Sequence, residues 1–138
     1  MGKRTYVMRF HHVGVVVASV EEQAARMQEL FGFDMRTQPV VDPFQQVRVA
    51  FINTNTDATI ELIEPLNETS PVTRFLTKGG YLNHLCYVVA DLEAAVDHLR
   101  KAGSLLVCEP TPAAAFQGRR IAFLYTRDRQ LVELLEEG

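Results

Sequence analysis

Two stretches of the chain carry the hydrophobic pattern of a β-strand followed by an amphipathic helix. Residues 6–18 and 82–90 are rich in β-branched and aromatic side chains, which is typical of strands. After each stretch the apolar residues recur three or four positions apart, as they do on one face of a helix. The apolar face is expected to contain Val20, Ala24, Met27 and Leu30-Phe31 in the first helix, and Leu92, Val96 and Leu99 in the second.

Both predicted helices carry start and stop signals. Ser19 stands at the start of the first helix, and Glu22, three residues later, completes a capping box. Asp91 takes the place of Ser19 before the second helix. Gly32 and Gly103 follow the last helical residues and are expected to end the helices, because glycine readily adopts the left-handed conformation found there.

Two or three further strands are expected after each helix. The pattern predicts two hairpins, in which 47–52 pairs with 59–63 and 121–125 pairs with 131–135. The element order is therefore βαβββ, twice, and the predicted fold class is α+β. Residues 36–46 and 108–118 are too long for tight turns, and we expect them to be loops that cover a substrate.

Residues 72 positions apart resemble one another, and no gap is needed between residues 12 and 64. The identical pairs are His12/His84, Val16/Val88, Val17/Val89, Ala18/Ala90, Glu21/Glu93, Phe44/Phe116, Gln45/Gln117, Arg48/Arg120, Ala50/Ala122, Phe51/Phe123, Thr54/Thr126, Glu61/Glu133, Leu62/Leu134 and Glu64/Glu136. Such self-similarity indicates a duplicated module. We expect a single domain made of two repeats, about 6–65 and 80–137, joined by a connector at 65–80.

The connector carries its own signals. Pro65 cannot donate a hydrogen bond to a neighbouring strand, so it is expected to end the strand before it. Ser70 and Pro71 are typical of an N-cap and a first helical residue. They predict a short helix over 72–78, which would end at the two glycines that follow.

Composition narrows the class of protein. The chain has 138 residues, 47% of them hydrophobic, which fits one soluble globular domain. The formal net charge of −3 argues against nucleic-acid binding, and no apolar run is long enough to span a membrane. No apolar segment of a signal peptide follows the basic N-terminus, so a cytoplasmic location is expected. Cys86 and Cys108 lack a C-x-x-C spacing and are expected to be reduced thiols.

Four potential metal ligands fall on repeat-related positions, and they are His12, Glu61, His84 and Glu133. A gapless repeat implies pseudo-twofold symmetry, which brings equivalent residues together near the axis. Two imidazoles and two carboxylates would offer nitrogen and oxygen donors to one divalent ion. Strand alternation places Glu61 on one face with Thr59 and Ile63. A carboxylate among apolar neighbours is costly to bury unless it is paired, protonated or bound to a metal.

Other acidic and imidazole groups fit this site less well. His11 lies on the opposite strand face from His12, and its repeat partner is Asn83, so we do not expect it to be a ligand. Glu64 and Glu136 also recur, but they share a strand face with leucines rather than with the candidate ligands. We expect these two glutamates to be solvated or structural.

A duplicated βαβββ module with His, Glu, His and Glu in this order resembles the vicinal oxygen chelate superfamily, which includes glyoxalase, bleomycin-resistance and dioxygenase proteins. The resemblance covers nearly the whole chain and is strongest to the methylmalonyl-CoA epimerase family. The matching stretches are 61–72, Phe75-Leu76, Gly79-Gly80, 83–89 and 131–134. The resemblance implies a curved mixed β-sheet around a central metal cleft, with His12, Glu61, His84 and Glu133 as the metal ligands.

The same resemblance implies a metal-dependent epimerase that moves a proton at a carbon α to a carbonyl. Its cofactor would be one divalent ion, Co, Ni, Mn, Zn or Fe, its substrate an acyl-CoA, and its assembly a homodimer. The strand 44–52 contains no Asp or Glu, so Glu61 and Glu133 are the hypothesised catalytic proton carriers. Two alternatives stay open: a glyoxalase I-like lactoylglutathione lyase or other metal-dependent superfamily enzyme acting on a thiol adduct, and a non-catalytic small-molecule-binding or resistance protein.

Two further residue pairs have open roles. Arg48 and Arg120 recur in both repeats, and they would bind the carboxylate or phosphates of an acyl-CoA or else be solvated strand arginines. Tyr87 and Tyr125 fit equally well as pocket walls or as core residues.

Overall fold

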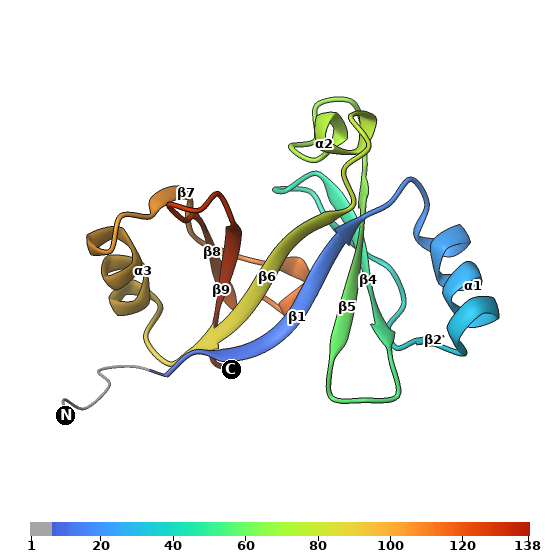
Figure 1. Ribbon diagram of the computed structural model, residues 1–138, viewed down its shortest axis with the longest axis horizontal. Helices are drawn as coiled ribbons and strands as arrows, with labels where there is room; N and C mark the ends of the chain where they lie inside the picture. The colour runs from blue at the N-terminus through green and yellow to red at the C-terminus, as the bar shows by residue number, and fades with distance from the viewer. Residues whose placement is uncertain (1–6) are drawn as a thin grey trace. The chain divides into compact units, whose positions relative to one another are not determined.

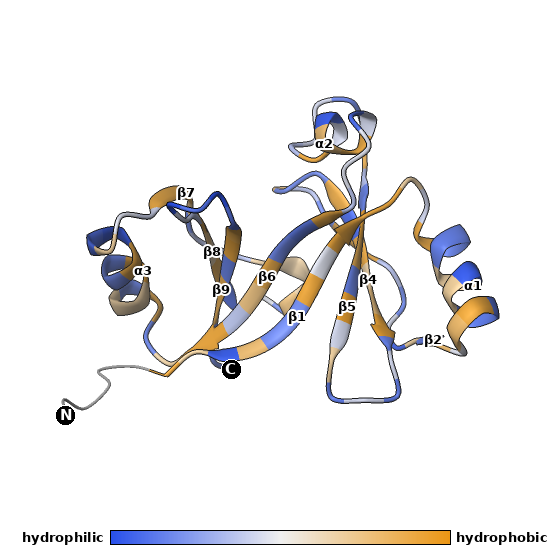
Figure 2. Ribbon diagram, in the orientation of Figure 1, coloured by the Kyte–Doolittle hydropathy of each residue, from blue (hydrophilic) through white to orange (hydrophobic). Residues whose placement is uncertain are grey.

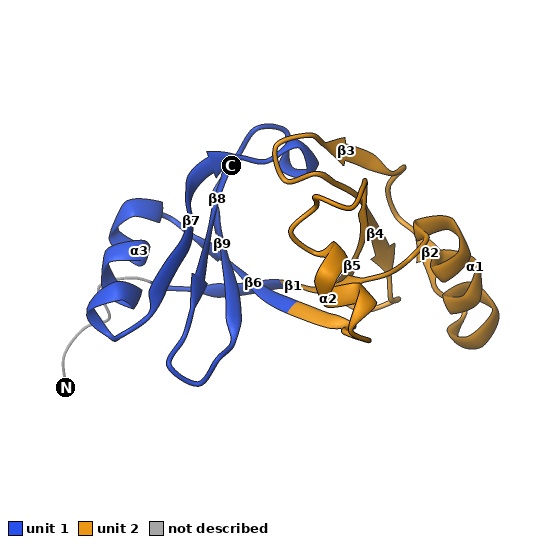
Figure 3. Ribbon diagram, turned by 90° about the horizontal axis from the view of Figure 1, so that it is seen from above, with its two compact units in different colours: residues 1–11, 84–138 blue, residues 12–83 orange. Residues whose placement is uncertain are grey.

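The computed structural model describes residues 7–138, and the first residue of the predicted strand 6–18 lies outside this range. The chain forms two compact units, which are coloured separately in Figure 3. Unit 2 contains residues 12–83, and unit 1 takes residues 84–138 together with the chain up to residue 11. Nine strands, three α-helices and one short 3-10 helix make up the described residues, so the predicted α+β class is confirmed.

Unit 2 contains a mixed sheet with one long helix packed on it (Figure 1). Its elements are β1 (Arg9–Val16, which begins in unit 1), α1 (Val20–Phe31), β2 (Asp34–Met35), β3 (Val40–Asp42), β4 (Val47–Asn53), β5 (Thr59–Pro65) and α2 (Thr73–Thr77). The strand order is β2-β4-β5-β1, and β3 also pairs with β4. Strand β1 runs parallel to β5, whereas β4 and β5 form the predicted antiparallel hairpin.

Unit 1 repeats this arrangement. Its elements are β6 (Leu82–Val89, which begins in unit 2), α3 (Leu92–Lys101), β7 (Leu105–Pro112), the 3-10 helix η1 (Ala114–Phe116), β8 (Arg120–Tyr125) and β9 (Leu131–Glu136). The strand order is β6-β9-β8-β7. Strand β6 is parallel to β9, and the β8–β9 hairpin is antiparallel as predicted.

Each unit has its own hydrophobic core between its long helix and its sheet. In unit 2 the core includes Val15, Val20, Ala24, Met27, Ala50, Ile52 and Leu62. In unit 1 it includes Val89, Leu92, Ala95, Val96, Ala122, Leu124 and Leu134. Figure 2 shows both hydrophobic and hydrophilic residues along α1 and α3, as expected for helices with one buried face.

The helix ends follow the predicted signals. The Ser19 side chain accepts a hydrogen bond from the Glu22 backbone N–H at 3.1 Å, and the Asp91 side chain accepts one from the Ala94 N–H at 3.0 Å. Gly32 ends α1 with φ of 74°. The Ser19 and Asp91 side chains each satisfy a backbone N–H that the helix itself leaves without a partner.

Leu30 and Phe31, placed on the apolar face of the first helix from the sequence, are not buried. These side chains are 62% and 60% exposed, although they continue the apolar stripe of α1. The chain turns at Gly32, and Phe33 and Met35 then pack against the core beyond the helix. Phe33 and Met35, rather than Leu30 and Phe31, therefore pack against the core of unit 2.

Two further expectations about loops and caps need correction. The N-cap of α2 is Val72 rather than Ser70, whose hydroxyl accepts from the Val72 N–H at 3.4 Å. The predicted loop 36–46 contains β3, and the first residues of the predicted loop 108–118 belong to the end of β7. Both segments gain backbone partners because they pair with β4 and β8, respectively. In residues 7–138 no helix has the length and hydropathy to cross a lipid bilayer.

Candidate metal centre

In unit 2, strands β1 and β5 place His12 and Glu61 side by side. The His12 Nε2 and the Glu61 Oε1 are 3.3 Å apart, and both side chains are buried. Thr59 and Ile63 on the same face of β5 are buried as well, which agrees with the predicted strand alternation. Unit 2 therefore holds one nitrogen and one oxygen donor in a site that excludes most water.

Phe51 supports the His12 ring. Its ring centroid lies 5.6 Å from that of His12, with an angle of 70° between the planes. Phe51 also stands directly opposite Glu61 in the β4–β5 ladder. An edge-to-face contact restricts how the imidazole can turn, so the backbone and one aromatic ring together orient His12 toward Glu61.

Unit 1 contains the same arrangement from the second repeat. The His84 Nε2 is 3.0 Å from the Glu133 Oε1, and both side chains are buried. The Phe123 ring meets the His84 ring at 5.4 Å and 90°, and Phe123 stands opposite Glu133 in the β8–β9 ladder. The repeat thus reproduces not only the two donors but also the aromatic residue that orients them.

Each unit thus buries one imidazole and one carboxylate, which are the donor types of a metal site. Imidazole nitrogens and carboxylate oxygens are common ligands of divalent transition metals. A buried carboxylate among apolar residues is costly unless it is protonated, paired with a protonated imidazole or bound to a cation. The residues present are therefore chemically suited to a divalent ion.

The two repeated arginines lie in ion-pair networks between a helix and the sheet. Arg48 donates to Glu21 of α1 at 2.7 Å and lies 3.5 Å from Glu64. Glu64 also accepts a hydrogen bond from the Val20 N–H at the start of α1, at 2.8 Å. Because Arg48 and Glu64 lie on the α1 face of the sheet, opposite to Glu61, this network joins helix to sheet rather than lining the candidate centre.

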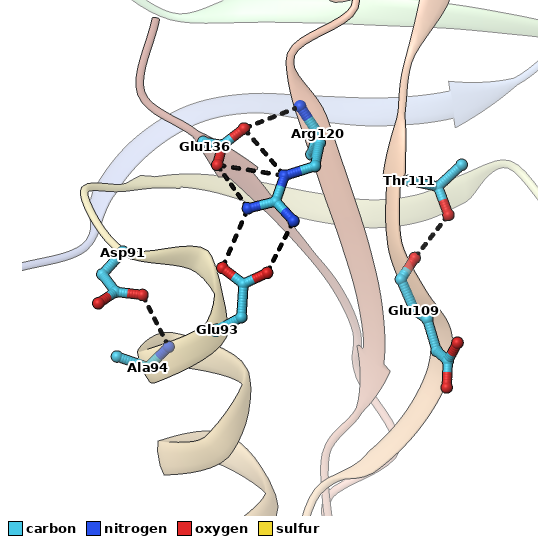
Figure 4. A network of polar contacts seen from close by, with 7 residues as sticks. All are labelled: Asp91, Glu93, Ala94, Glu109, Thr111, Arg120 and Glu136. Atoms are coloured by element: carbon cyan, nitrogen blue, oxygen red, sulfur yellow. Dashed lines mark hydrogen bonds and ion pairs between the residues drawn. The ribbon is translucent and has the colours of Figure 1, made fainter.

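Unit 1 repeats this network around Arg120, as Figure 4 shows. Arg120 donates to Glu93 of α3 at 2.7 and 3.0 Å and to Glu136 of β9 at 2.7 Å. Hydrogen bonds from Arg120 lower the pKa of both Glu93 and Glu136. In unit 2, the hydrogen bond from Arg48 lowers the pKa of Glu21 from 4.5 to about 2. Of the two alternatives for Glu64 and Glu136, solvated or structural, these contacts favour the structural one.

The remaining candidates differ in their contacts and in their exposure. The His11 ring packs edge-on against Phe116 at 5.6 Å. Tyr87 packs against the core of unit 1, which favours its assignment as a core residue over that as a pocket wall. Tyr125 is exposed. Cys86 is buried and Cys108 is half-buried, and the two form no disulfide within residues 7–138.

Three residues near the candidate ligands were not singled out from the sequence. Phe51 and Phe123 recur in the repeat, and that recurrence was the available signal. The third is Arg36, whose guanidinium lies 5.7 Å from the Phe51 ring centroid. Its repeat counterpart is Cys108, so the repeat gave no signal for it.

Comparison with known proteins gives one family. A family model described as the glyoxalase/bleomycin resistance protein/dioxygenase superfamily matches residues 11–123. An ethylmalonyl-CoA/methylmalonyl-CoA epimerase of Cereibacter sphaeroides is 36% identical over 130 residues, which cover 91% of this chain and 96% of that protein. The mitochondrial methylmalonyl-CoA epimerase of Homo sapiens is 31% identical over 122 residues, covering 87% of this chain and 68% of that protein.

Solved structures point in the same direction. The crystal structure of methylmalonyl-CoA epimerase from Mycobacterium tuberculosis superposes with a TM-score of 0.83 at 29% sequence identity. The match covers 99% of this chain and 93% of that one. The βαβββ modules derived from the sequence are thus present in a solved fold over nearly their full length.

Proposed function

The chain belongs to the glyoxalase/bleomycin resistance protein/dioxygenase superfamily, and from this membership we propose that it is a metal-dependent epimerase of methylmalonyl-CoA. The observation that carries the proposal is the buried His–Glu pair that recurs in both units of a chain whose named relatives are epimerases. The reaction inverts the carbon between the thioester carbonyl and the free carboxylate of the acyl group.

We propose that His12, Glu61, His84 and Glu133 together hold one divalent ion, although each structural unit supplies only one His and one Glu. Imidazole and carboxylate donors suit Co, Ni, Mn, Zn and Fe alike, so the donor set leaves the choice among these ions open. When bound, such an ion acts as a Lewis acid that stabilises the negative charge on the developing enolate oxygen.

The two glutamates are the proposed catalytic residues. One carboxylate removes the α-proton, the C–H electron pair forms the C=C bond of an enolate, and the carbonyl π pair moves onto the oxygen. The other glutamate, in its acid form, then gives a proton to the opposite face of the carbon as the carbonyl re-forms. Glu61 and Glu133 occupy equivalent positions in the two repeats. We propose that each carboxylate serves one of the two faces of the reacting carbon. Strand β4 contributes no Asp or Glu, and therefore supplies no third acid for this step.

The relatives do not favour the alternative of a glyoxalase I-like lyase, because those with a named activity include epimerases of the methylmalonyl-CoA type. A non-catalytic binding protein would have no need of a buried His–Glu pair in each unit. We further propose that the two repeats form a single functional domain and that the protein assembles as a homodimer, as the family resemblance implies.

Deuterium exchange tests the proposed function. The protein is incubated with a divalent ion and methylmalonyl-CoA in deuterated water, and α-deuteration is followed by mass spectrometry. We expect rapid α-deuteration of methylmalonyl-CoA and none of the hemithioacetal formed by methylglyoxal and glutathione. Absence of deuteration of methylmalonyl-CoA at catalytic protein concentrations would contradict the proposal, and turnover of the glutathione adduct would support the lyase instead.

A further inference from the structure

Arg36 lies directly after β2 and is tied to the strands that carry the candidate centre of unit 2. Its backbone N–H donates to the Phe51 carbonyl at 2.7 Å. Its Nη1 donates to the Thr59 hydroxyl at 3.3 Å, and its Cζ lies 5.7 Å from the Phe51 ring centroid. A cation over an aromatic face is attracted by the ring, so these contacts hold the guanidinium in one place.

That place is on the face of the sheet that carries the candidate ligands. Thr59 precedes Glu61 by two residues in β5, and side chains two residues apart point to the same face. The Phe51 ring that contacts the guanidinium also contacts the His12 ring. Arg36 is therefore separated from His12 by a single aromatic side chain.

The charge of Arg36 has no acidic partner. Within residues 7–138 no carboxylate lies at ion-pair distance from Arg36, whereas Arg48 and Arg120 are each bound by two glutamates. The side chain is exposed, so its remaining N–H groups are accessible to a ligand. A guanidinium held in this way is suited to two parallel hydrogen bonds with a carboxylate.

Arg36 also breaks the symmetry between the repeats, because Cys108 occupies the equivalent position in unit 1. The proposed substrate is also asymmetric, because only one side of its reacting carbon carries a charge. Its reacting carbon carries a charged carboxylate on one side and a neutral thioester on the other. Two equivalent His–Glu pairs do not distinguish these groups, whereas one guanidinium beside one of the pairs does.

We infer that Arg36 binds the free carboxylate of the acyl group and so sets the orientation of the substrate. This inference rests on the proposed function. The carboxylate is favoured over the phosphates of CoA, because the phosphates are separated from the reacting carbon by the length of the pantetheine arm. Arg36, by contrast, lies one aromatic ring away from a candidate ligand.

Three compounds and three variants test the assignment. The compounds are methylmalonyl-CoA, methylmalonyl-pantetheine, which lacks the CoA phosphates, and propionyl-CoA, which lacks the free carboxylate. The variants are R36M, R36K and, as a control, R26M on the exposed surface of α1. Exchange kinetics give kcat and KM for the first two compounds, and calorimetry gives Kd for propionyl-CoA.

R36M is expected to lower kcat/KM about 10- to 100-fold for both methylmalonyl compounds, the effect of losing a hydrogen-bonded ion pair. Its Kd for propionyl-CoA should equal that of the wild type, R36K should recover part of the loss, and R26M should change nothing. A loss that appears with propionyl-CoA and disappears with methylmalonyl-pantetheine would assign Arg36 to a phosphate and overturn the inference. A kcat/KM of R36M equal to that of the wild type would also overturn the inference. A wild type with no activity toward methylmalonyl-CoA would instead refute the proposed function.

Discussion

At the scale of single residues, the candidate centre is built by short-range rules that the sequence displays. Strand alternation alone predicted that Glu61 would share a buried face with Thr59 and Ile63, and the structure buries all three. The orientation of His12 depends in addition on Phe51, a residue that the sequence marked only by its recurrence. The strand face on which a candidate ligand lies can thus be predicted from the sequence. The contact between Phe51 and the His12 ring cannot, because it depends on how three strands pair.

Arg36 shows where prediction from the sequence ends. It lies in a stretch predicted to be a loop, and its repeat counterpart is uncharged. Its position follows from a backbone hydrogen bond to Phe51 and a side-chain hydrogen bond to Thr59, both of which join residues far apart in the sequence. No local periodicity reports such contacts.

Substitution of either proposed proton carrier should stop exchange. We expect E61Q and E133Q each to reduce α-deuteration of methylmalonyl-CoA by about 10²- to 10⁴-fold, because the amide neither accepts nor returns the proton. Metal analysis of the same samples separates a lost proton carrier from a lost ligand. E68Q, at an exposed glutamate of the connector, serves as the control. Wild-type exchange rates in both variants with metal still bound would exclude these roles.

At the scale of elements, each long helix is fixed to its sheet by the same three-residue ion-pair network. In α1 the partners are Glu21, Arg48 and Glu64, and in α3 they are Glu93, Arg120 and Glu136. The helix starts were predictable from their N-caps, because capping depends on neighbours in the sequence. The ion-pair networks were not predictable from the sequence, because each one joins a helix to two strands that are distant along the chain.

The unit 2 network predicts a pH-dependent contribution to stability. Hydrogen bonding to Arg48 lowers the pKa of Glu21 to about 2 in the folded protein, below its ordinary 4.5. The ionised pair therefore stabilises the fold above about pH 4.5, and this contribution is lost as the pH falls from 4.5 toward 2. E21Q should lower Tm slightly at pH 7, because water screens an exposed pair.

Thermal unfolding of E21Q and the wild type across this pH range checks the sign. The difference in Tm between them should shrink as the pH falls and vanish near pH 2. E29Q, on the same helix but outside any ion pair in the described chain, should show no such trend. A difference in Tm that stayed constant or grew toward low pH would contradict the assignment.

At the scale of the whole molecule, a duplicated βαβββ module explains the recurrence of the His–Glu pair, its supporting phenylalanine and the ion-pair network. The α+β class and the element order followed from the repeat before any coordinates were used. The differences between the two units did not follow from the repeat. Phe44 is 65% exposed, whereas its counterpart Phe116 is 8% exposed and contacts His11. Identical residues in a repeat acquire different surroundings when the flanking loops differ.

The most direct test of the central claim is the number of Co²⁺ ions bound per chain, measured by calorimetry and elemental analysis on metal-free protein. One ion per chain is predicted, and H12A and H84A should each abolish stoichiometric binding, because both pairs contribute to one site. H98A, at an exposed histidine of α3, should bind as the wild type does. Two ions per chain, or full binding in either H12A or H84A, would show that the pairs act separately and would contradict the proposed centre.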